Sequence, residues 1–167
     1  MARQTTITVQ GKPFFPVGGQ THNSSFYRLE ELSQAMAAVK AVGGNSIATP
    51  IGWDAFEPEE GTFNHELVTG IIDLARREGI HLCLLWFGTW KNGMMEYAPR
   101  WVKNNPERFH RVKTRDGYEA DALSCYCKAN LEADCKAFRE LLRLLRDYDG
   151  DTQTVYAVQV ENEPGNI

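Results

Sequence analysis

The sequence predicts an α/β fold that forms part of a TIM (β/α)8 barrel, and three observations predict it. Strand-like and helix-like segments alternate along the 167 residues, as in parallel strands joined by helical crossovers. The first strand is not followed by the G-x-G-x-x-G turn typical of doubly wound sheets, because the residues there are Gly18-Gly19-Gln20-Thr21-His22. The last strand ends on carboxylates and an amide, and barrels carry their active sites at such strand ends.

The N-terminal residues predict a β-hairpin that leads into a strand. Thr5–Val9 and Pro13–Val17 are extended segments joined at Gly11-Lys12. A first helix follows and ends at Gly43-Gly44, with apolar residues at steps of three and four: Leu29, Leu32, Met36 and Val39. Residues 45–50 then form a short strand.

A second helix is expected between Asn64, a suitable N-cap, and Gly79, a suitable stop. Its inner face consists of Leu67, Ile71, Leu74 and Ala75. The almost continuous apolar run Ile80–Phe87 predicts a strand that is covered on both faces. From Gly88 to Lys128 the sequence has no clear period, and a loop of that length is uncommon unless it has a function.

A third helix is predicted with Asn130 as its N-cap and Asp149-Gly150-Asp151 as its end. Its inner stripe is Leu131, Cys135, Phe138, Leu142 and Leu145. The final strand contains Val155, Ala157, Val158 and Val160 and is stopped by Pro164-Gly165. Residues 1–167 are therefore expected to be one domain: a hairpin and the first four β/α units, the N-terminal half of a barrel truncated after strand 4.

Composition excludes several classes of function. A net charge of −4 and a pI near 5.6 give no electrostatic case for binding nucleic acid or an anionic membrane surface. No apolar stretch approaches the roughly 20 residues that span a bilayer. Residues 1–10 show no signal peptide, so the chain as given is expected to be cytoplasmic, although a parent enzyme could be exported. The spacing of Cys125-Tyr126-Cys127 does not suit zinc, and neither a metal nor another cofactor is expected.

Three segments resemble one known group. Val158–Gly165 resembles the fourth-strand signature of clan A retaining glycoside hydrolases, and within that clan the β-galactosidases of families 35 and 42. Trp53–Phe63 resembles the W-x-x-x-E-P-x-x-G-x-(F/Y) element after the second strand of these enzymes, and Trp86–Val102 resembles their sugar-facing third loop. The resemblance extends over the whole chain and over the first half of the family's catalytic barrel.

The resemblance implies hydrolysis of terminal β-galactosides by a retaining two-carboxylate mechanism, with Glu163 as the general acid/base. Asn162 would hydrogen-bond the sugar 2-hydroxyl. The alternatives are that Glu163 only caps the following turn and that Asn162 is only a turn residue. Glu161 is expected on the same side of the strand as Glu163, so all three residues reach the sugar only if the strand is twisted or bulged. Otherwise Glu161 is a salt-bridged or solvated carboxylate.

Four more residues are candidates for substrate binding: Trp86, Trp90, Asn92 and His22. Each tryptophan follows a strand tip and would either stack on a sugar ring or fill the loop core. Asn92 would reach sugar hydroxyls or make the Asn92-Gly93 turn, and His22 lies near the end of the first strand.

Two nearby positions are interpreted differently. Glu57 is expected to organise a turn before the second helix rather than to take part in chemistry. Thr89 departs from family 35, whose members tend to carry a Glu immediately before the tryptophan that Trp90 matches.

The resemblance places the nucleophilic Glu at the end of the seventh strand of the barrel. The 167-residue chain alone is therefore expected to be inactive or nearly so. The open edges of a half barrel predict self-association or pairing with a complementing half barrel. The alternatives are a non-catalytic carbohydrate-binding or half-barrel assembly module, and another clan A specificity such as β-mannosidase or endoglucanase.

Overall fold

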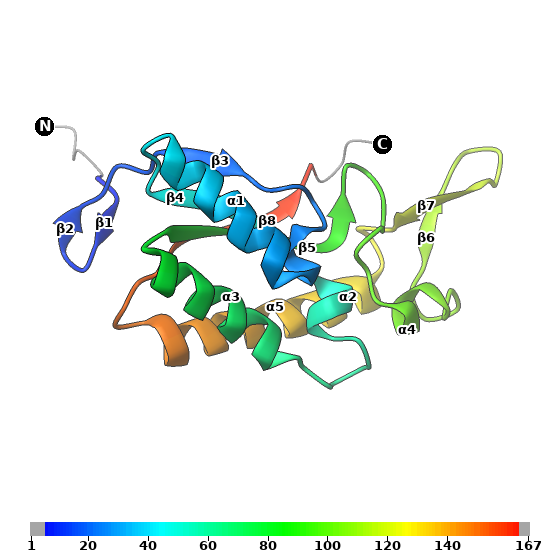
Figure 1. Cartoon of the computed structure of the whole chain (residues 1–167). Helices are drawn as coiled ribbons and strands as arrows, with labels where there is room; N and C mark the ends of the chain where they lie inside the picture. Colours follow the sequence, from blue (N-terminus) through cyan, green and yellow to red (C-terminus); the bar gives the residue numbers. More distant parts are fainter. Residues whose placement is uncertain (1–5, 164–167) are drawn as a thin grey trace, which may run out of the picture.

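The computed structural model describes residues 6–163, and its centre is a parallel four-stranded sheet (Figure 1). The strands are β3 (Gly18–Gln20), β4 (Ser46–Gly52), β5 (His81–Lys91) and β8 (Val155–Asn162). They lie in the order β3-β4-β5-β8, so each strand pairs with the next one along the chain. This order has no reversal point, which distinguishes the wall of a barrel from a doubly wound sheet. The predicted α/β fold is confirmed.

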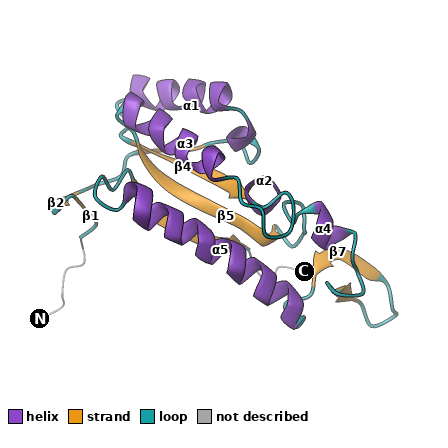
Figure 2. Ribbon diagram, turned by 90° about the horizontal axis from the view of Figure 1, so that it is seen from below, coloured by secondary structure: helices purple, strands orange, loops and turns teal. Residues whose placement is uncertain are grey.

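Each pair of neighbouring strands is joined by a helix. The three helices are α1 (Leu29–Ala41), α3 (His65–Glu78) and α5 (Lys128–Asp149). Figure 1 shows α3 between α1 and α5, and Figure 2 shows α5 running along β5. Two single-turn helices lie in the loops after β3 and β4: η1 (Ser25–Tyr27) and α2 (Trp53–Phe56).

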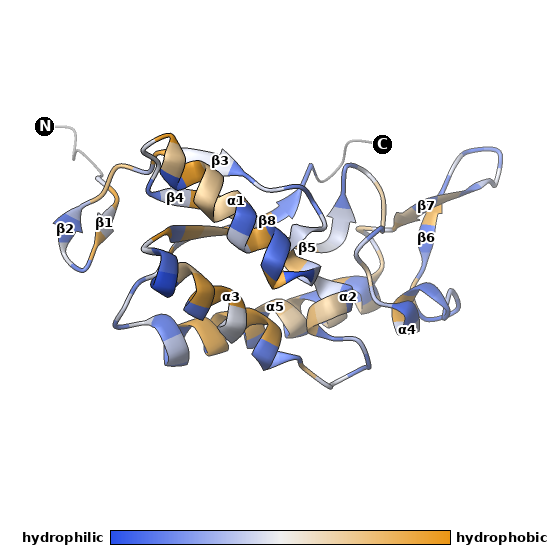
Figure 3. Ribbon diagram, viewed as in Figure 1, coloured by the Kyte–Doolittle hydropathy of each residue, from blue (hydrophilic) through white to orange (hydrophobic). Residues whose placement is uncertain are grey.

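The hydrophobic core lies between these helices and the sheet. β5 is buried along almost its whole length, as predicted for a strand covered on both faces. Hydrophobic and hydrophilic residues alternate around the turns of α1 and α3, which is expected of helices with one buried face (Figure 3). In α3 the buried residues are Val68, Ile71, Ile72, Leu74 and Ala75.

Among the helices of residues 6–163, none has both the length and the apolar composition to cross a bilayer.

Both ends of α3 form as the sequence predicts. The Asn64 side chain accepts a hydrogen bond from the Leu67 backbone N–H at 3.1 Å. Gly79 follows the last turn with φ +67° and ψ +32°, a left-handed conformation that costs glycine little. These two local signals determine where the helix begins and ends.

The N-terminal hairpin is present but short. β1 (Thr8–Val9) pairs antiparallel with β2 (Lys12–Pro13). The turn residues Gln10 and Gly11 both have positive φ, the geometry that suits a two-residue hairpin. Pro13–Val17 does not form the predicted second strand, because β2 ends at Pro13 and the sheet strand begins at Gly18. Thr5 lies outside the described residues.

The segment from residue 88 to residue 128 is more ordered than its sequence predicts. It contains a helical turn, α4 (Arg100–Lys103), and an antiparallel hairpin of β6 (Arg111–Lys113) and β7 (Glu119–Leu123). These strands are too short to show a hydrophobic period. Figure 1 shows the hairpin projecting away from the main sheet.

The predicted N-cap of the third helix is wrong. α5 begins at Lys128, and Asn130 lies inside its first turn with 1% of its surface exposed. The Asn130 Nδ2 group donates to the backbone oxygens of His110 and Ser124, each at 2.9 Å. The amide therefore binds the preceding loop instead of capping the helix.

The predicted inner stripe of α5 is confirmed at Leu145, which is buried, and at Phe138, which packs against the core, whereas its other three residues are displaced by one position. The buried residues are Asn130, Asp134, Ala137, Leu141, Leu145 and Asp149. Leu131 is 59% exposed, Leu142 is 42% exposed, and Cys135 is exposed. Three of the buried residues, Asn130, Asp134 and Asp149, are therefore polar where the sequence suggests an apolar face.

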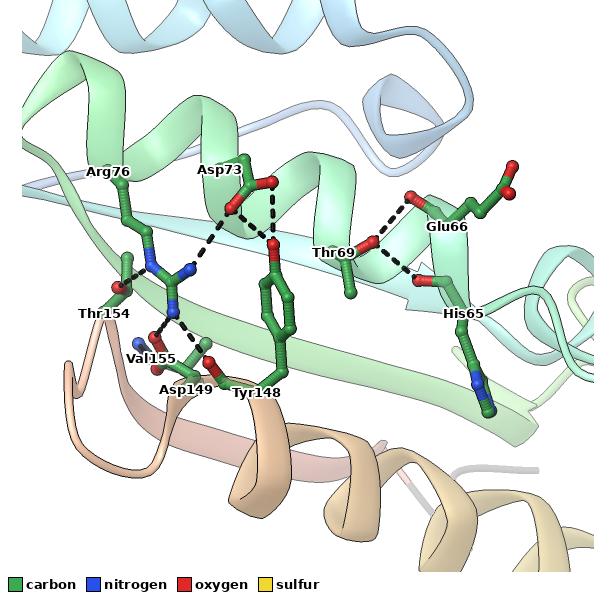
Figure 4. Close-up of polar contacts among 9 residues, drawn as sticks. All are labelled: His65, Glu66, Thr69, Asp73, Arg76, Tyr148, Asp149, Thr154 and Val155. Carbon is green, nitrogen blue, oxygen red and sulfur yellow. Dashed lines mark hydrogen bonds and ion pairs between the residues drawn. The ribbon is translucent and has the colours of Figure 1, made fainter.

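A polar network holds α3, the end of α5 and the start of β8 together (Figure 4). Arg76 donates to Asp149 Oδ1 at 2.9 Å, to the Tyr148 backbone oxygen at 2.9 Å and to Thr154 Oγ1 at 3.2 Å. The other Asp149 oxygen accepts the Val155 N–H at 2.7 Å. The network lies at the amino end of β8, the end of a barrel that contributes to stability rather than to catalysis.

Candidate active site

The carboxyl ends of β5 and β8 meet at a bulge. Trp86 pairs with Val160 and Lys91 pairs with Asn162, so residues 87–90 of β5 lie opposite Glu161 alone. Glu161 has φ +60°, an uncommon conformation for a residue other than glycine. A bulge, which the sequence requires if Glu161, Asn162 and Glu163 are all to reach the sugar, is therefore present.

Glu161 binds the backbone of the bulge. Its Oε1 accepts the Thr89 N–H at 3.0 Å, and its Oε2 accepts the Trp90 N–H at 2.9 Å. The carboxyl group is thus neither the salt-bridged nor the solvated group that the sequence analysis expected. It compensates for the ladder hydrogen bonds that the bulged residues lose.

Asp134 supports the same bulge from the helix side. It is 8% exposed; its Oδ1 accepts the Trp86 indole N–H at 2.8 Å, and its Oδ2 accepts the Thr89 N–H at 2.8 Å and the Thr89 hydroxyl at 2.5 Å. Gly88 permits this approach. A Cβ at that position would lie 2.5 Å from Asp134 Oδ2 and 2.5 Å from Trp86 Nε1.

The surroundings of Glu161 raise the pKa of its carboxyl group. Burial, followed by the hydrogen bond and the negative charge of Asp134, raises the pKa of Glu161 to about 9, against the opposing effect of the Trp90 and Thr89 amides. Glu161 therefore keeps its proton at neutral pH. A protonated carboxyl group beside a second carboxyl group satisfies both without a cation.

Stability should consequently fall as pH rises from about 5 to about 9. An unfolded Glu loses its proton near pH 4.5, whereas folded Glu161 keeps its proton until about pH 9, so the folded state binds more protons in that window. Glu161→Gln cannot ionise and should lose less stability over the same range. The free energy of unfolding in urea, measured at pH 5, 7 and 9, should favour Gln increasingly, since each pH unit between the two pKa values costs the wild type up to about 1.4 kcal/mol.

The exposed Glu59→Gln variant is the control for this prediction, since Glu59 lies on the surface and should show the wild-type slope. Equal pH slopes for wild type and Glu161→Gln would contradict the shifted pKa.

Lys91, the last residue of β5, connects two residues that the sequence analysis assigned to substrate binding. Its Nζ donates to Asn162 Oδ1 at 2.9 Å and to Asn92 Oδ1 at 2.5 Å. The side chain is 8% exposed, and Nζ lies 5.0 Å from the centre of the Phe87 ring. The sequence analysis missed Lys91, although a lysine that ends a buried strand is a signal in itself.

Asn162 and Glu163 occupy the tip of β8, as expected. Asn162 is the last residue of the strand and is partly buried, whereas Glu163 directly follows it, is exposed and has φ +53°. The structure thus brings Asn162, Asn92 and Lys91 into contact and places Glu163 beside them in the chain.

The two tryptophans lie inside the protein. Trp86 has no exposed surface, and its ring contacts Phe56 and Phe138, so of its two predicted roles the structure supports core packing and argues against sugar stacking. Trp90 is 4% exposed and lines a cavity of about 180 Å³ between the bulge, the loop at Ser124 and the start of α5.

His22 is exposed in the loop after β3. Its Nδ1 lies 3.4 Å from the Ser24 backbone N–H, which donates to it. Among the hydrogen bonds of residues 6–163, none joins His22 to the Lys91 group, and its role at the pocket stays a prediction.

Glu57 organises the turn after α2, as predicted. It is 1% exposed; its Oε2 accepts the Trp53 indole N–H at 2.7 Å, and its Oε1 accepts the Gly61 N–H at 2.7 Å. The Trp101 indole donates to the Glu57 backbone oxygen at 3.1 Å. Both Glu57 carboxylate oxygens are bound by fixed donors, so this residue is structural.

A second polar group at the carboxyl end of β4 was not predicted. The Tyr27 hydroxyl donates to Asp54 Oδ2 at 2.7 Å, and the hydroxyls of Ser24 and Tyr97 lie 3.2 Å apart. Burial raises the pKa of Asp54, although the Tyr27 hydrogen bond opposes the shift.

Within residues 6–163, no group of three or more His, Cys, Asp or Glu side chains is arranged to hold a metal ion.

Sequence comparison connects this geometry with known enzymes. The family model of glycoside hydrolase family 42, described as beta-galactosidase, matches residues 23–167. The exo-beta-D-glucosaminidase of Pyrococcus horikoshii is 25% identical over 142 residues, which cover 75% of this chain and 18% of that protein.

Two solved structures have the same fold. An exo-beta-1,4-mannosidase from Opitutaceae bacterium strain TAV5 superposes with a TM-score of 0.67 at 16% identity, covering 94% of this chain and 26% of the other. A beta-galactosidase from the Antarctic haloarchaeon Halorubrum lacusprofundi gives 0.64 at 22% identity, covering 89% of this chain and 22% of the other. The chain thus spans about a fifth to a quarter of the length of these proteins.

Proposed function

This chain belongs to glycoside hydrolase family 42, the family described as beta-galactosidase, and from that premise we propose that it supplies the acid/base part of a retaining β-galactosidase. The observation that carries the proposal is the tip of β8. Within the family match, Asn162 and Glu163 stand at the carboxyl end of a parallel strand, where barrel enzymes hold their catalytic groups.

In the proposed reaction Glu163 acts twice. It donates its proton to the glycosidic oxygen as the bond from that oxygen to sugar C1 breaks, and it then takes a proton from the water that releases the sugar. A second carboxylate, about 5–5.5 Å away, attacks C1 in the first step and leaves in the second. The family resemblance places this nucleophile on the seventh strand of the barrel.

Asn162 would bind the sugar at the adjacent position. Its amide would donate a hydrogen bond to the 2-hydroxyl oxygen, a contact that strengthens as positive charge develops at C1. Asn162 is a suitable candidate because it is partly buried and its Oδ1 is already bound by Lys91.

The test uses the native polypeptide that contains this sequence and the 4-nitrophenyl β-glycosides of galactose, glucosamine, mannose and glucose. The proposal expects the highest kcat/KM with the galactoside. Proton NMR during early turnover should show β-galactose before α-galactose, because retention releases the β-anomer first. Hydrolysis with release of α-galactose first, or no turnover of the galactoside, would overturn it.

A second candidate substrate is a β-linked glucosamine. The observation that favours it is the 25% identity to the exo-beta-D-glucosaminidase over three quarters of the chain. The same panel decides between the two sugars, since this candidate expects the glucosaminide to be hydrolysed faster than the galactoside. Sugar binding without turnover of any substrate would instead support a non-catalytic carbohydrate-binding module.

The isolated 167-residue chain is expected to be inactive in the same assay, since it would lack the nucleophile. It is also expected to self-associate, because Val160 on β8 is 60% exposed and Leu142 on α5 is 42% exposed. Light scattering on a sizing column measures the mass, and the galactoside assay measures turnover. A monomeric, active 167-residue chain would contradict both expectations, whereas the native polypeptide is the positive control.

A further inference from the structure

We propose that Lys91 is a positioning residue: anchored by the Asn92 oxygen, it fixes the side-chain amide of Asn162 so that this amide presents its N–H donors to the substrate. The inference rests on the proposed function, because it concerns how that site recognises the sugar. It assigns a role to a residue outside the Asn162-Glu163 pair.

The chemistry of an ammonium group determines the orientation of both amides. The Lys91 ammonium has three N–H donors and no acceptor, so only the oxygen of an amide can bind it. The Nζ contacts of 2.9 Å to Asn162 Oδ1 and 2.5 Å to Asn92 Oδ1 therefore define which end of each amide faces the lysine. The NH₂ end of Asn162 must face away from Lys91.

Burial makes this orientation persistent. Lys91 is 8% exposed, and hydrogen bonds from a charged donor are shorter and about twice as strong as neutral ones. The centre of the Phe87 ring lies 5.0 Å from Nζ, within the range of a cation–π contact. Rotating the Asn162 amide by half a turn would place its NH₂ group against the buried Lys91 ammonium. The repulsion between these donors prevents that rotation.

The effect should be felt in the transition state. The Asn162 contact with the sugar 2-hydroxyl strengthens as C1 becomes positive, and a donor that is already oriented costs no reorganisation at that moment. Loss of Lys91 should therefore lower kcat more than it raises KM.

The experiment compares two substrates. In the native polypeptide, Lys91→Met keeps the length of the side chain and removes the charge. We expect kcat for an aryl β-galactoside to fall about 10- to 100-fold, the loss typical of a hydrogen bond to a charged group. The matching 2-deoxy-galactoside lacks the 2-hydroxyl, so its kcat should change less than about threefold by the same reasoning. Equal losses on both substrates would overturn the proposal.

A double-mutant cycle tests whether Lys91 acts through Asn162. Lys91→Met combined with Asn162→Ala should be no slower than Asn162→Ala alone, whereas additive losses would show an independent role. Lys103→Met is the matched control. Lys103 also lies between residues 88 and 128, but its Nζ donates to the Glu96 backbone oxygen at 2.6 Å and not to an Asn162 or Asn92 amide. The kcat of this control should therefore stay close to that of the wild type.

A second readout does not depend on turnover. The side-chain amide NMR signals of Asn162 should move in Lys91→Met and stay in place in Lys103→Met. If wild type hydrolyses no galactoside but these signals move, the proposed function fails and the positioning role stands. Unmoved signals overturn the positioning role whether or not the protein is active.

If Lys91→Met does not fold, Lys91→Arg replaces it in both measurements. The guanidinium keeps the charge but cannot occupy the position of a compact ammonium between two amides. A loss confined to the galactoside supports the proposal, and wild-type kinetics with unmoved Asn162 signals overturns it.

Discussion

Glu163→Gln is expected to lower kcat of the native polypeptide about 10²- to 10⁴-fold on a β-galactoside whose leaving group needs protonation, the range that general acid/base catalysis contributes. The substitution removes the transferable proton and the later base while preserving the shape of the side chain. Steady-state kinetics with an alkyl or disaccharide galactoside measures the loss.

The leaving group separates a lost acid from a damaged site. In a 2,4-dinitrophenyl galactoside the leaving group is 2,4-dinitrophenolate, which departs without protonation. The variant should therefore still form the glycosyl-enzyme intermediate from this substrate. Azide needs no general base, so it should restore turnover and yield β-galactosyl azide. The exposed Glu59→Gln is the matched control and should retain most of its activity, because Glu59 lies on the surface away from the tip of β8. A greater loss in Glu59→Gln than in Glu163→Gln would reject the assignment.

Trp86→Ala is expected to destabilise the protein by about 3–5 kcal/mol, the range for removal of a fully buried large aromatic side chain. Trp86 has no exposed surface and packs against Phe56 and Phe138. The substitution also removes the indole N–H that Asp134 accepts at 2.8 Å. The free energy of unfolding in urea measures the effect.

Two companion variants divide this loss into packing and hydrogen bonding. Trp86→Phe keeps most of the ring but not the N–H, so it should cost about 1–3 kcal/mol, the cost of an unsatisfied buried polar group. Tyr126→Ala removes an aromatic residue that is 96% exposed and should change stability by less than about 0.5 kcal/mol. A loss below about 1 kcal/mol for Trp86→Ala would show that the side chain is not part of the core.

The parts of the fold that local chemistry controls could be predicted from the sequence. Asn64 and Gly79 determine the ends of α3 through a side-chain cap and a left-handed glycine, and both signals lie within a few residues of the helix. The alternation of strands and helices likewise indicated a parallel sheet, and the strand order agrees.

The orientation of α5 could not be predicted in this way. The predicted stripe through Leu131 and Leu142 and the observed one through Asn130 and Asp134 have the same helical spacing. Hydrophobicity favours the first. The second is formed because Asp134 meets the Trp86 indole and the Thr89 amide, donors that lie more than 40 residues away in sequence.

In the candidate site, too, the residues with a local signal could be predicted and the contacts between strands could not. The tip of β8 was predicted because a strand that stops at Asn162 and Glu163 carries its own signal, strengthened by the family resemblance. The contact between Lys91 and Asn162 depends on the bulge in β5, which changes the register between the strands. Register is a tertiary property, and the sequence of either strand alone does not specify it.

Gly88 and Asp134 are coupled through the space they share. A methyl group at position 88 would overlap the Asp134 carboxylate and the Trp86 indole nitrogen. A larger residue there therefore fits only where position 134 becomes smaller, loses its hydrogen bond to the bulge amide and leaves the indole free to shift. Substitutions at these two positions should therefore occur together during divergence of the family. A relative without Gly88 and Asp134 should lack the bulge in its equivalent of β5. The residue equivalent to Lys91 would then no longer reach the asparagine at the end of the neighbouring strand, β8.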